Sequence, residues 1–577
     1  MKSFFRSFFA CMLAVLVFVL VIFSIVAVKS GQKSKIDDHS YLVVDIYGEL
    51  PEYDPPAGVI GELMGGKAET LQRILSNMDK VCVDDRIDGV ILKLSSSSSF
   101  GGAKMQEIRG AIKKVREAGK KVYGFADSMD RKTCFLAAAC DSVYMVPTGY
   151  FSFTGFAAVT EHLKGTLDKL GIKPNLHKIK DYKSAAEMIM REDMSAAARE
   201  NKEWLLDEFW ELLITGLESD RGLSEEDVID MMKLAVFTPE EAVEGGLIDR
   251  KLYWEELADM LKGDDDEDLR TVSQCRYADE DPEKLGIKGK KKIAVIHAQG
   301  MIGGRKNKVD PMFGLIMGHE SINAEFKRAR EDDDVAAIVF RIDSGGGDAL
   351  TSDIIGHEVE ITASEKPVVA SMVDVAASGG YHIAYRASRI IADPMTITGS
   401  IGSISMKFNM RGFLNKLGIT NDFATKGPMA LFFSSYRDFT EEERKRFEDD
   451  HWNGFNSWLE DVAEHRGMTF EEAEKLAHGR VWSGRQGAEN GLVDEMGGLD
   501  RAIELARELA EIPAGDGVTV VHYPAKKGLL EAITGGEGGL TAAAHYVVYR
   551  LIRGDIAETW NMVTESRMYM MEDFSIE

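Results

Sequence analysis

The sequence has little cysteine and no excess of positive charge. Its 577 residues include 69 Lys and Arg against 95 Asp and Glu, a formal net charge of −26. This balance argues against a protein that wraps nucleic acid, because that function needs a basic face. No two cysteines form a Cys-x-x-Cys pair, and their number is odd, so neither a metal site nor a disulfide framework is predicted. The five cysteines are Cys11, Cys82, Cys134, Cys140 and Cys275.

The composition is that of a folded protein with more than one core. Hydrophobic residues make up 45% and charged residues 28% of the chain, which is typical of globular proteins. A chain of 577 residues is too long for one ordinary core, so two or three domains are expected.

The N-terminus carries a long apolar run. Lys2 and Arg6 precede residues 8–28, which are interrupted by a single polar residue, Ser24. As a helix this run is about 31 Å long, enough for a hydrocarbon core of about 30 Å. It is longer than a typical signal-peptide core, and no small-x-small cleavage site is evident. We therefore expect residues 1–35 to be an uncleaved membrane anchor, with the N-terminus in the cytoplasm and the large body in the periplasm.

The rest of the chain is an internal duplication. Four segments of the first half resemble four segments of the second at an offset that stays near 244–248 residues. The pairs are 84–102 with 331–349, 142–155 with 388–400, 170–183 with 417–428, and 240–250 with 485–495.

Both halves alternate strand-like apolar runs with segments of helical spacing. Such alternation predicts an α/β fold of stacked β–α units with mostly parallel sheets. A charged stretch of low hydrophobicity separates the halves and is typical of a linker. The expected organisation is an anchor (1–35), an N-terminal domain (36–262), a linker (263–291), a C-terminal domain (292–517) and a tail (518–577).

Three small-residue turns of the second half could carry chemistry. The stretch 339–350, VFRIDSGGGDAL, is a buried strand that ends in a glycine loop, whose backbone N–H groups could hold a phosphate or an oxyanion. It matches neither a dinucleotide fingerprint nor a Walker loop. In DVAASGGYH, Ser378 follows a strand-like run and precedes two glycines, the arrangement of a nucleophile elbow. The third turn is TGSIGS, residues 398–403.

A serine nucleophile needs a base. His382 lies four residues beyond Ser378 on the same expected helix, and this placement leaves it little freedom to reach both the serine and the leaving group. The alternative is a lysine kept neutral by a desolvating pocket, and lowering a lysine pKa from about 10.4 to about 7 costs roughly 4–5 kcal/mol. Composition alone does not select that lysine.

The motifs resemble those of the signal peptide peptidase A (protease IV) family in its tandem-domain bacterial form, related in fold to Clp protease and the crotonases. The resemblance covers roughly residues 36–510. It is carried by Asp343–Gly347, Ala377–Tyr381, Thr398–Gly402, Tyr182–Ala185 and residues 191–195. It implies two tandem Clp-protease-like domains after the membrane helix.

The resemblance also implies the site residues. Ser378 would be the nucleophile, Lys183 the general base, and Ser400 the residue that orients the lysine. The oxyanion hole would combine the N–H of Gly379 with one N–H from Gly346 or Gly347. No metal or cofactor is implied.

The sequence departs from the family at one position of this loop. Gly345 stands where the family usually has proline. We expect a more flexible loop that keeps both N–H donors.

The duplication divides the implied pair of residues between the halves. The first half has Lys132 or Thr133 where the second has Ser378, without a glycine pair. The second half has GPMALFF, with no lysine, where the first has Lys183. Only the two halves together would make a site.

The expected function is that of a membrane-anchored serine endopeptidase of the bacterial inner membrane. It would degrade cleaved signal peptides and other apolar peptides on the extracytoplasmic side, as a homotetramer. Two alternatives stay open. A crotonase-type acyl-CoA enzyme could use the glycine loop to hold a thioester oxyanion, but an export segment separates this chain from cytosolic CoA. A non-catalytic membrane scaffold would be expected to lose one of the two residues.

Overall fold

The computed structural model describes residues 36–53, 69–263, 268–287, 289–310 and 313–524. The predicted anchor at residues 1–35 and the tail from residue 525 lie outside these ranges. Within these ranges no helix has both the length and the apolarity to cross a membrane.

The first half is built on a six-stranded parallel sheet of order β10-β1-β2-β3-β5-β9. Strands such as IDGVILKL are apolar on both faces because helices and the other half of the chain cover the sheet. The strands are β1 (Ser40–Ile46), β2 (Ile87–Leu94), β3 (Lys121–Ala126), β5 (Ser142–Met145), β9 (Arg250–Lys251) and β10 (Thr271–Ser273). The helices are α3 (Leu71–Val83), α4 (Gly102–Glu117), α5 (Arg131–Ala137), α6 (Lys164–Leu170), α7 (Glu187–Met190), α8 (Ala196–Arg221), α9 (Glu225–Leu234), α10 (Pro239–Glu244), α11 (Trp254–Leu261) and α12 (Gln274–Ala278).

The second half is built on an eight-stranded sheet of order β20-β18-β16-β15-β11-β22, with β17 beside β16 and β21 beside β17. Every pair in it is parallel except β18 with β20. The strands are β11 (Lys291–Gln299), β15 (Val335–Ser344), β16 (Val368–Ala377), β17 (Arg389–Ala392), β18 (Ile397–Gly399), β20 (Val481–Ser483), β21 (Glu495–Met496) and β22 (Val518–Tyr523). The helices are α13 (His319–Glu331), α14 (Ala349–Glu365), α15 (Gly379–His382), α16 (Arg411–Lys416), α17 (Glu441–Arg466), α18 (Phe470–Leu476), α19 (Gly484–Asn490) and α20 (Leu499–Leu509).

Small sheets complete the two halves. In the first, β4 (Met129–Asp130), β6 (Phe151–Ser152) and β8 (Val236–Phe237) form one such sheet. In the second, β12 (Met301–Ile302), β13 (Lys308–Asp310) and β14 (Gly314–Met317) form another. The prediction of an α/β fold with mostly parallel sheets is confirmed.

Two expected boundaries need correction. Part of the predicted linker belongs to the first half, since β10 pairs with β1 and α12 contributes the fully buried Tyr277. Tyr277 donates a hydrogen bond to Asp84 at 3.0 Å and accepts one from Lys80 through its carbonyl at 2.8 Å. The predicted tail begins with β22, which pairs with β11. Both segments pack through only a few apolar residues. Because charged residues surround them, the average hydrophobicity of each segment stays low.

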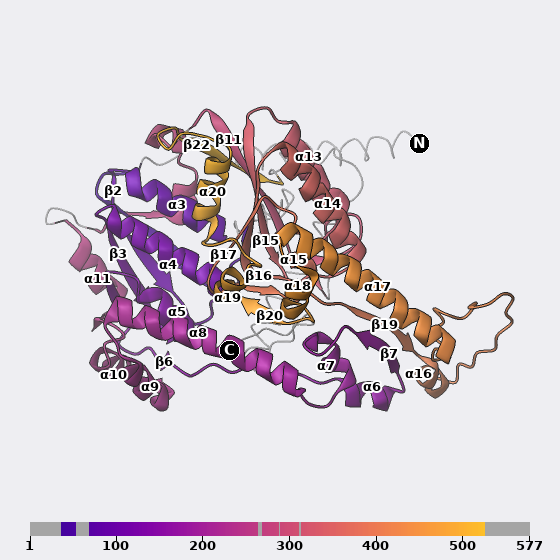
Figure 1. The fold of residues 1–577 in the computed structure, drawn as a ribbon. Coiled ribbons are helices and arrows are strands. Elements are labelled where there is room, and N and C mark those ends of the chain that lie inside the picture. Colours follow the sequence, from indigo (N-terminus) through magenta and orange to yellow (C-terminus); the bar gives the residue numbers. More distant parts are fainter. Residues whose placement is uncertain (1–35, 54–68, 264–267, 288, 311–312, 525–577) are drawn as a thin grey trace, which may run out of the picture.

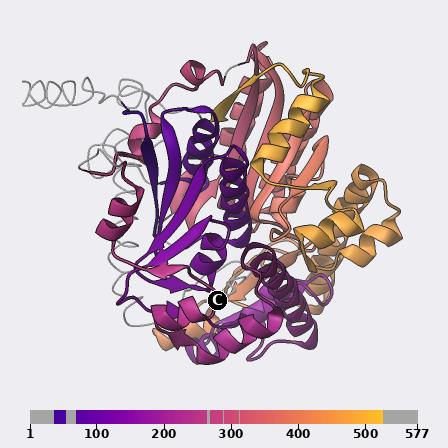
Figure 2. The same cartoon turned by 90° about the vertical axis from the view of Figure 1, so that its left-hand side faces the viewer.

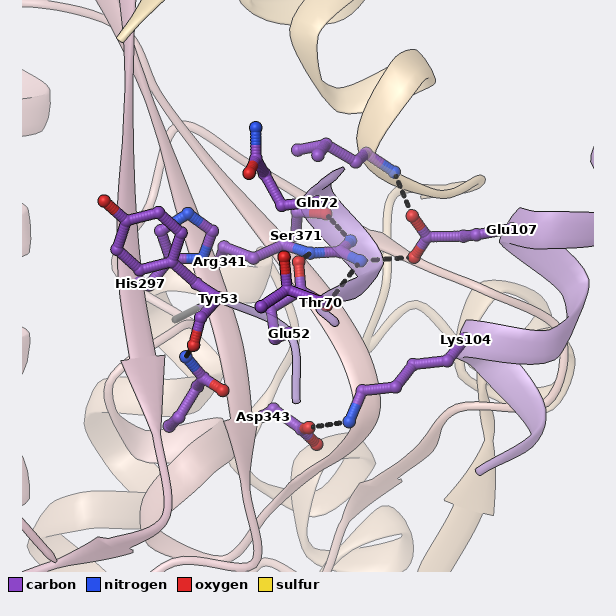
Figure 3. Close-up of polar contacts among 12 residues, drawn as sticks. Glu52, Tyr53, Thr70, Gln72, Lys104, Glu107, His297, Arg341, Asp343 and Ser371 are labelled. Atoms are coloured by element: carbon purple, nitrogen blue, oxygen red, sulfur yellow. Dashed lines mark hydrogen bonds and ion pairs between the residues drawn. The ribbon is translucent and has the colours of Figure 1, made fainter. Parts of the chain in front are cut away.

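The two halves share one core. Figure 2 shows the two sheets side by side, with α3, α4 and α20 between them. A buried ionic group crosses the interface: the fully buried Arg341 of β15 contacts Glu52 at 2.8 Å, Glu107 of α4, and the hydroxyl of Ser371 at 2.8 Å (Figure 3). Since a buried charge without partners is very costly, this contact favours a single mutual arrangement of the halves.

A second connection between the halves is a two-stranded ribbon. Strand β7 (Lys173–Lys178) of the first half pairs antiparallel with β19 (Ile404–Asn409) of the second. Figure 1 shows this ribbon in an arm with α6 and α16 that projects beyond the sheets. The chain leaves β7 and reaches Lys183 five residues later, so the ribbon determines where that lysine lies.

Candidate active site

Ser378 lies where β16 ends and α15 begins. Its backbone has φ 55° and ψ −116°, a conformation rarely adopted by residues other than glycine. Its N–H donates to the carbonyl of Gly399 at 2.9 Å, because Ala377 and Gly399 are partners in the parallel β16–β18 register. The side chain is half-buried, and no side chain caps α15 at this point. A serine presented on a strained strand-to-helix turn is the geometry of a nucleophile elbow.

Lys183 of the first half contacts Ser400 of the second. Its Nζ donates to the Ser400 hydroxyl at 2.7 Å and to the Ser400 carbonyl at 3.2 Å. Lys183 is 4% exposed and Ser400 is fully buried. Because Ser400 follows Gly399 directly, the turn 399–400 binds Ser378 on one side and Lys183 on the other.

The segment that carries Lys183 is held on several sides. The N–H of Ile179 donates to the Ser403 carbonyl at 3.1 Å. Lys178 bonds the carbonyl of Asp181 at 3.1 Å and the carboxylate of Glu187 at 3.0 Å. These contacts fix the loop that carries Lys183 at both ends. The loop therefore holds Lys183 in position against the second half.

Gly479 is a site residue that sequence reasoning missed. It has φ +83°, and a Cβ on it would lie 2.5 Å from both the N and the Cα of Lys183. Its neighbour Arg480 accepts a hydrogen bond from the N–H of Ser400 at 2.7 Å and places its guanidinium over the rings of Tyr182 and Trp204. In the sequence only the glycine of AHGRVW marks this position. The fold is needed to show that the Lys183 backbone packs against it.

The glycine loop and the serine turn are in direct backbone contact. A Cβ on Gly346 would lie 2.6 Å from the N of Gly379, and one on Gly379 would lie 3.0 Å from the N of Gly347. The N–H of Gly346 already donates to the Ser344 hydroxyl at 3.1 Å. Among the described residues no acceptor takes the N–H of Gly347 or of Gly379. Of the two loop glycines, Gly347 therefore has the N–H that remains available beside Gly379.

His382 has other contacts. Its ring stacks on Trp458 with centroids 4.8 Å apart, and its Nε2 lies 3.6 Å from Asp353. Burial lowers the pKa of His382, against the raising influence of Asp353. Its N–H donates to the Ser378 carbonyl as part of α15. The ring is thus packed on the α14–α15–α17 side.

No metal site accompanies these groups in the part of the chain that the structure describes. There, no three His, Cys, Asp or Glu side chains are grouped so that they could hold a metal ion. The polar groups that can act are the Ser378 hydroxyl, the Lys183 Nζ and the two backbone N–H donors. A strained serine turn beside unbonded backbone N–H groups is typical of hydrolases that use a serine nucleophile.

Comparison with known proteins identifies the class as serine peptidase. The sequence profile of Peptidase family S49 matches residues 114–267 and 360–513, and the chain belongs to this family. The two matches lie one in each half, which confirms the tandem organisation.

The relatives align with most of the chain. It is 33% identical over 475 residues to the chloroplastic serine protease SPPA of Arabidopsis thaliana, covering 81% of this chain and 70% of the relative. It is 28% identical over 519 residues to Protease 4 of Haemophilus influenzae, covering 85% of this chain and 83% of the relative. Among solved structures, ClpP1 from Listeria monocytogenes aligns with 13% identity and a TM-score of 0.24, over 36% of this chain and 94% of that chain.

Proposed function

We propose that the chain is an endopeptidase in which Ser378 attacks the peptide carbonyl and Lys183 is the general base. The observation that carries the proposal is the 2.7 Å contact between the buried Lys183 and Ser400, one residue from the glycine that binds the Ser378 backbone. It supports the proposal because the Lys183 side chain of one half and the Ser378 backbone of the other both contact the turn 399–400.

The proposed reaction uses only groups of this chain and water. Neutral Lys183 takes the proton of the Ser378 hydroxyl as its oxygen attacks the carbonyl carbon. The N–H groups of Gly379 and Gly347 bind the oxyanion, and protonated Lys183 gives its proton to the leaving amine. Water activated by the same lysine then releases the acyl group. Ser400 accepts a hydrogen bond from the lysine and orients it.

A fluorophosphonate probe tests the nucleophile. We expect labelling of the wild-type chain and none of Ser378→Ala, with peptidase activity lost in parallel. Labelling that persists in Ser378→Ala at the wild-type rate would contradict the assignment. An acyl-CoA enzyme would instead turn over a thioester and leave an apolar peptide intact. A scaffold would be unlabelled in the wild-type form.

The proposed location is the extracytoplasmic face of the bacterial inner membrane, with residues 8–28 as the anchor. Cleaved signal peptides accumulate there, and an anchor keeps the enzyme beside them. We expect the full chain to sediment with membranes and a chain lacking residues 1–35 to stay in the soluble fraction. Equal sedimentation of both would contradict the anchor.

The proposed assembly is a homotetramer, and an exposed segment of the second half supports contact between copies. In the register that aligns Phe151 with Ile397, β7 corresponds to residues 419–424 and β19 to residues 158–163. Residues 419–424 form no strand in the structure. The apolar side chains on and around them are exposed: Leu417 60%, Ile419 47%, Phe423 40%, Met429 39% and Phe433 83%.

The ribbon that joins the halves could therefore recur between copies, residues 419–424 of one pairing with 158–163 of the next. Such a head-to-tail contact builds a ring when its rotation closes. We expect Ile419→Glu to lower the mass measured by light scattering to that of the monomer. An unchanged tetramer mass would exclude this contact.

A further inference from the structure

A buried lysine of the first half lies between two carboxylates of the second. Lys104, in the first turn of α4, is 8% exposed, and its Nζ is 2.8 Å from Asp343 and 3.2 Å from Asp374. Figure 3 shows the long Lys104 side chain reaching from α4 to Asp343. Asp343 begins the glycine loop, and Asp374 precedes Ser378 by four residues. One side chain thus bridges the two segments that form the serine turn and the oxyanion loop.

Asp374 also replaces a missing helix cap. The N-cap of α4 is Gly101, which has no side chain, whereas the corresponding helix α14 is capped by its own Asp348. The Asp374 carboxylate accepts the N–H groups of Gly101 and Lys104, each at 3.1 Å. A Cβ on Gly101 would lie 2.3 Å from the carboxyl carbon of Asp374, so the glycine makes room for this contact. The turn at Gly101 therefore binds the Asp374 carboxylate of β16, which caps the N-terminus of α4.

Asp343 stabilises an irregularity in the nucleophile's strand. The register between β15 and β16 shifts after the pair Ile342–Met372, and the next pair is Ser344–Ala376. The strand β16 therefore carries extra residues at this point, and one of them, Val375, donates its N–H to the Asp343 carboxylate at 3.3 Å. Such bulges redirect a strand next to active sites. This bulge sets the direction in which β16 enters the turn at Ser378.

The charges at the bulge are balanced by Lys104. Burial alone would lower the pKa of Lys104, but Asp343 and Asp374 together hold it above its usual range. Burial raises the pKa of Asp343, Lys104 opposes this effect, and the like charge of Asp374 adds to it. Without the lysine, two partly buried carboxylates would repel one another across the bulge.

We propose that Lys104 is a positioning residue for the peptidase reaction: by clamping Asp343 to Asp374, it holds the serine turn and the oxyanion loop in register. The proposal rests on the proposed function, because it takes Ser378 as the nucleophile. Lys104 acts through the two carboxylates and the strand between them. The first half would then supply the base and also the clamp that shapes the second half's site.

Turnover of the full chain on a fluorogenic apolar peptide tests the proposal. In Lys104→Met we expect kcat to fall at least about tenfold, because small displacements of reacting groups cost this much or more, with KM nearly unchanged. Concentrations are set by fluorophosphonate titration, so that the comparison counts only folded sites. In Lys104→Met/Asp374→Asn one of the facing charges is removed while the capping oxygen remains, and kcat should recover most of the loss.

Lys114→Met is the matched control. Lys114 lies on the same helix and contacts Asp79 of the first half at 2.5 Å and Asp500 of the second half at 3.0 Å, but it is half exposed. It should keep wild-type kcat. Equal kcat in Lys104→Met and Lys114→Met overturns the proposal, and so does a double variant as slow as Lys104→Met. If Lys104→Met does not fold, the double variant tests the proposal alone. A kcat of the double variant tenfold below that of the wild type then overturns the proposal. Peptide turnover that survives in Ser378→Ala would instead refute the proposed function.

Discussion

The two halves differ most where the second has its serine turn. In the second half, Ser378 precedes α15 with φ 55° and no side-chain cap. In the first half, Asp130 precedes α5 with φ −116° and forms a capping box with Thr133, so the predicted counterparts Lys132 and Thr133 lie in the first turn of a relaxed helix. Backbone strain of this kind costs about 1–3 kcal/mol. It is present at the turn that presents the proposed nucleophile and absent from the corresponding turn of the first half.

The scaffold around these turns is alike. The helices α8 and α17 each have 26 residues and end at a left-handed glycine, Gly222 and Gly467. Each then makes the same ion pair, Arg221 with Asp249 at 3.0 Å and Arg466 with Asp494 at 2.8 Å. In this pair of helices the length, the C-terminal glycine and the following ion pair were kept, while the residues of the serine turn diverged. The difference indicates that the fold needs both halves to be similar, whereas the chemistry needs them to differ.

Removing Lys183, the first half's proposed general base, should have the largest effect on activity. We expect Lys183→Ala to lower kcat/KM roughly 10³-fold, since a general base contributes about 10²–10⁴-fold. Adding Met429→Lys, at the corresponding position of the second half, should restore nothing because residue 429 lies on an exposed segment. Lys180→Ala is the control, as Lys180 is in the same loop but pairs with Glu474 at the surface. Recovery in the double variant would show that the halves are interchangeable.

Displacing Lys183 without replacing it should have the next largest effect. A methyl group at Gly479 would collide with the Lys183 backbone, so Gly479→Ala should lower kcat about 10²-fold. Gly467→Ala is matched to it, since Gly467 also has positive φ, +63°, but open space around it. The control should lose stability and keep its kcat. Equal kcat values in the two variants would mean that the position of Lys183 tolerates movement.

The ionic contact between the halves should make stability depend on pH. Burial raises the pKa of Glu107 to about 7, Arg341 opposes this effect, and Glu52 adds to it. A carboxyl whose pKa is raised in the folded state contributes stability below its unfolded value near 4.5, and this contribution is lost as the pH rises through about 7.

In urea unfolding, Glu107 should therefore contribute a fall in the free energy of unfolding between pH 4.5 and pH 8. In Glu107→Gln this slope should be smaller, and in the surface variant Glu508→Gln it should be that of the wild type. A wild-type slope in Glu107→Gln would assign the titration to another group.

The smallest effect is expected from substituting Gly345 in the glycine loop. A Cβ on Gly345 would meet nothing within 4 Å. Gly345→Ala should therefore raise the free energy of unfolding by about 0.4–1 kcal/mol, by restricting the unfolded chain, and leave kcat unchanged. A thermal melt and a turnover assay measure both quantities. Destabilisation would show that the loop needs a conformation that only glycine adopts.

Local patterns in the sequence determined much of this protein. Apolar runs bounded by polar turns predicted the buried parallel strands, and the near-constant offset between similar segments predicted two halves. The serine–glycine turn at Ser378 was visible because an exposed nucleophile at the end of a strand needs small neighbours. The motif Tyr182–Ala185 drew attention to Lys183 by resemblance alone.

Only the tertiary structure decided which groups meet. It brought Lys183 to Ser400 through a ribbon between the halves, assigned the N–H of Gly346 to Ser344, and placed Asp374 on the N-terminus of α4. Each of these contacts joins segments that are distant in sequence or depends on the direction of a single N–H. Contacts of either kind leave no periodic pattern in the sequence. Residues 271–278 escaped prediction for a related reason: a few apolar side chains suffice to dock a short segment, too few to change its average composition.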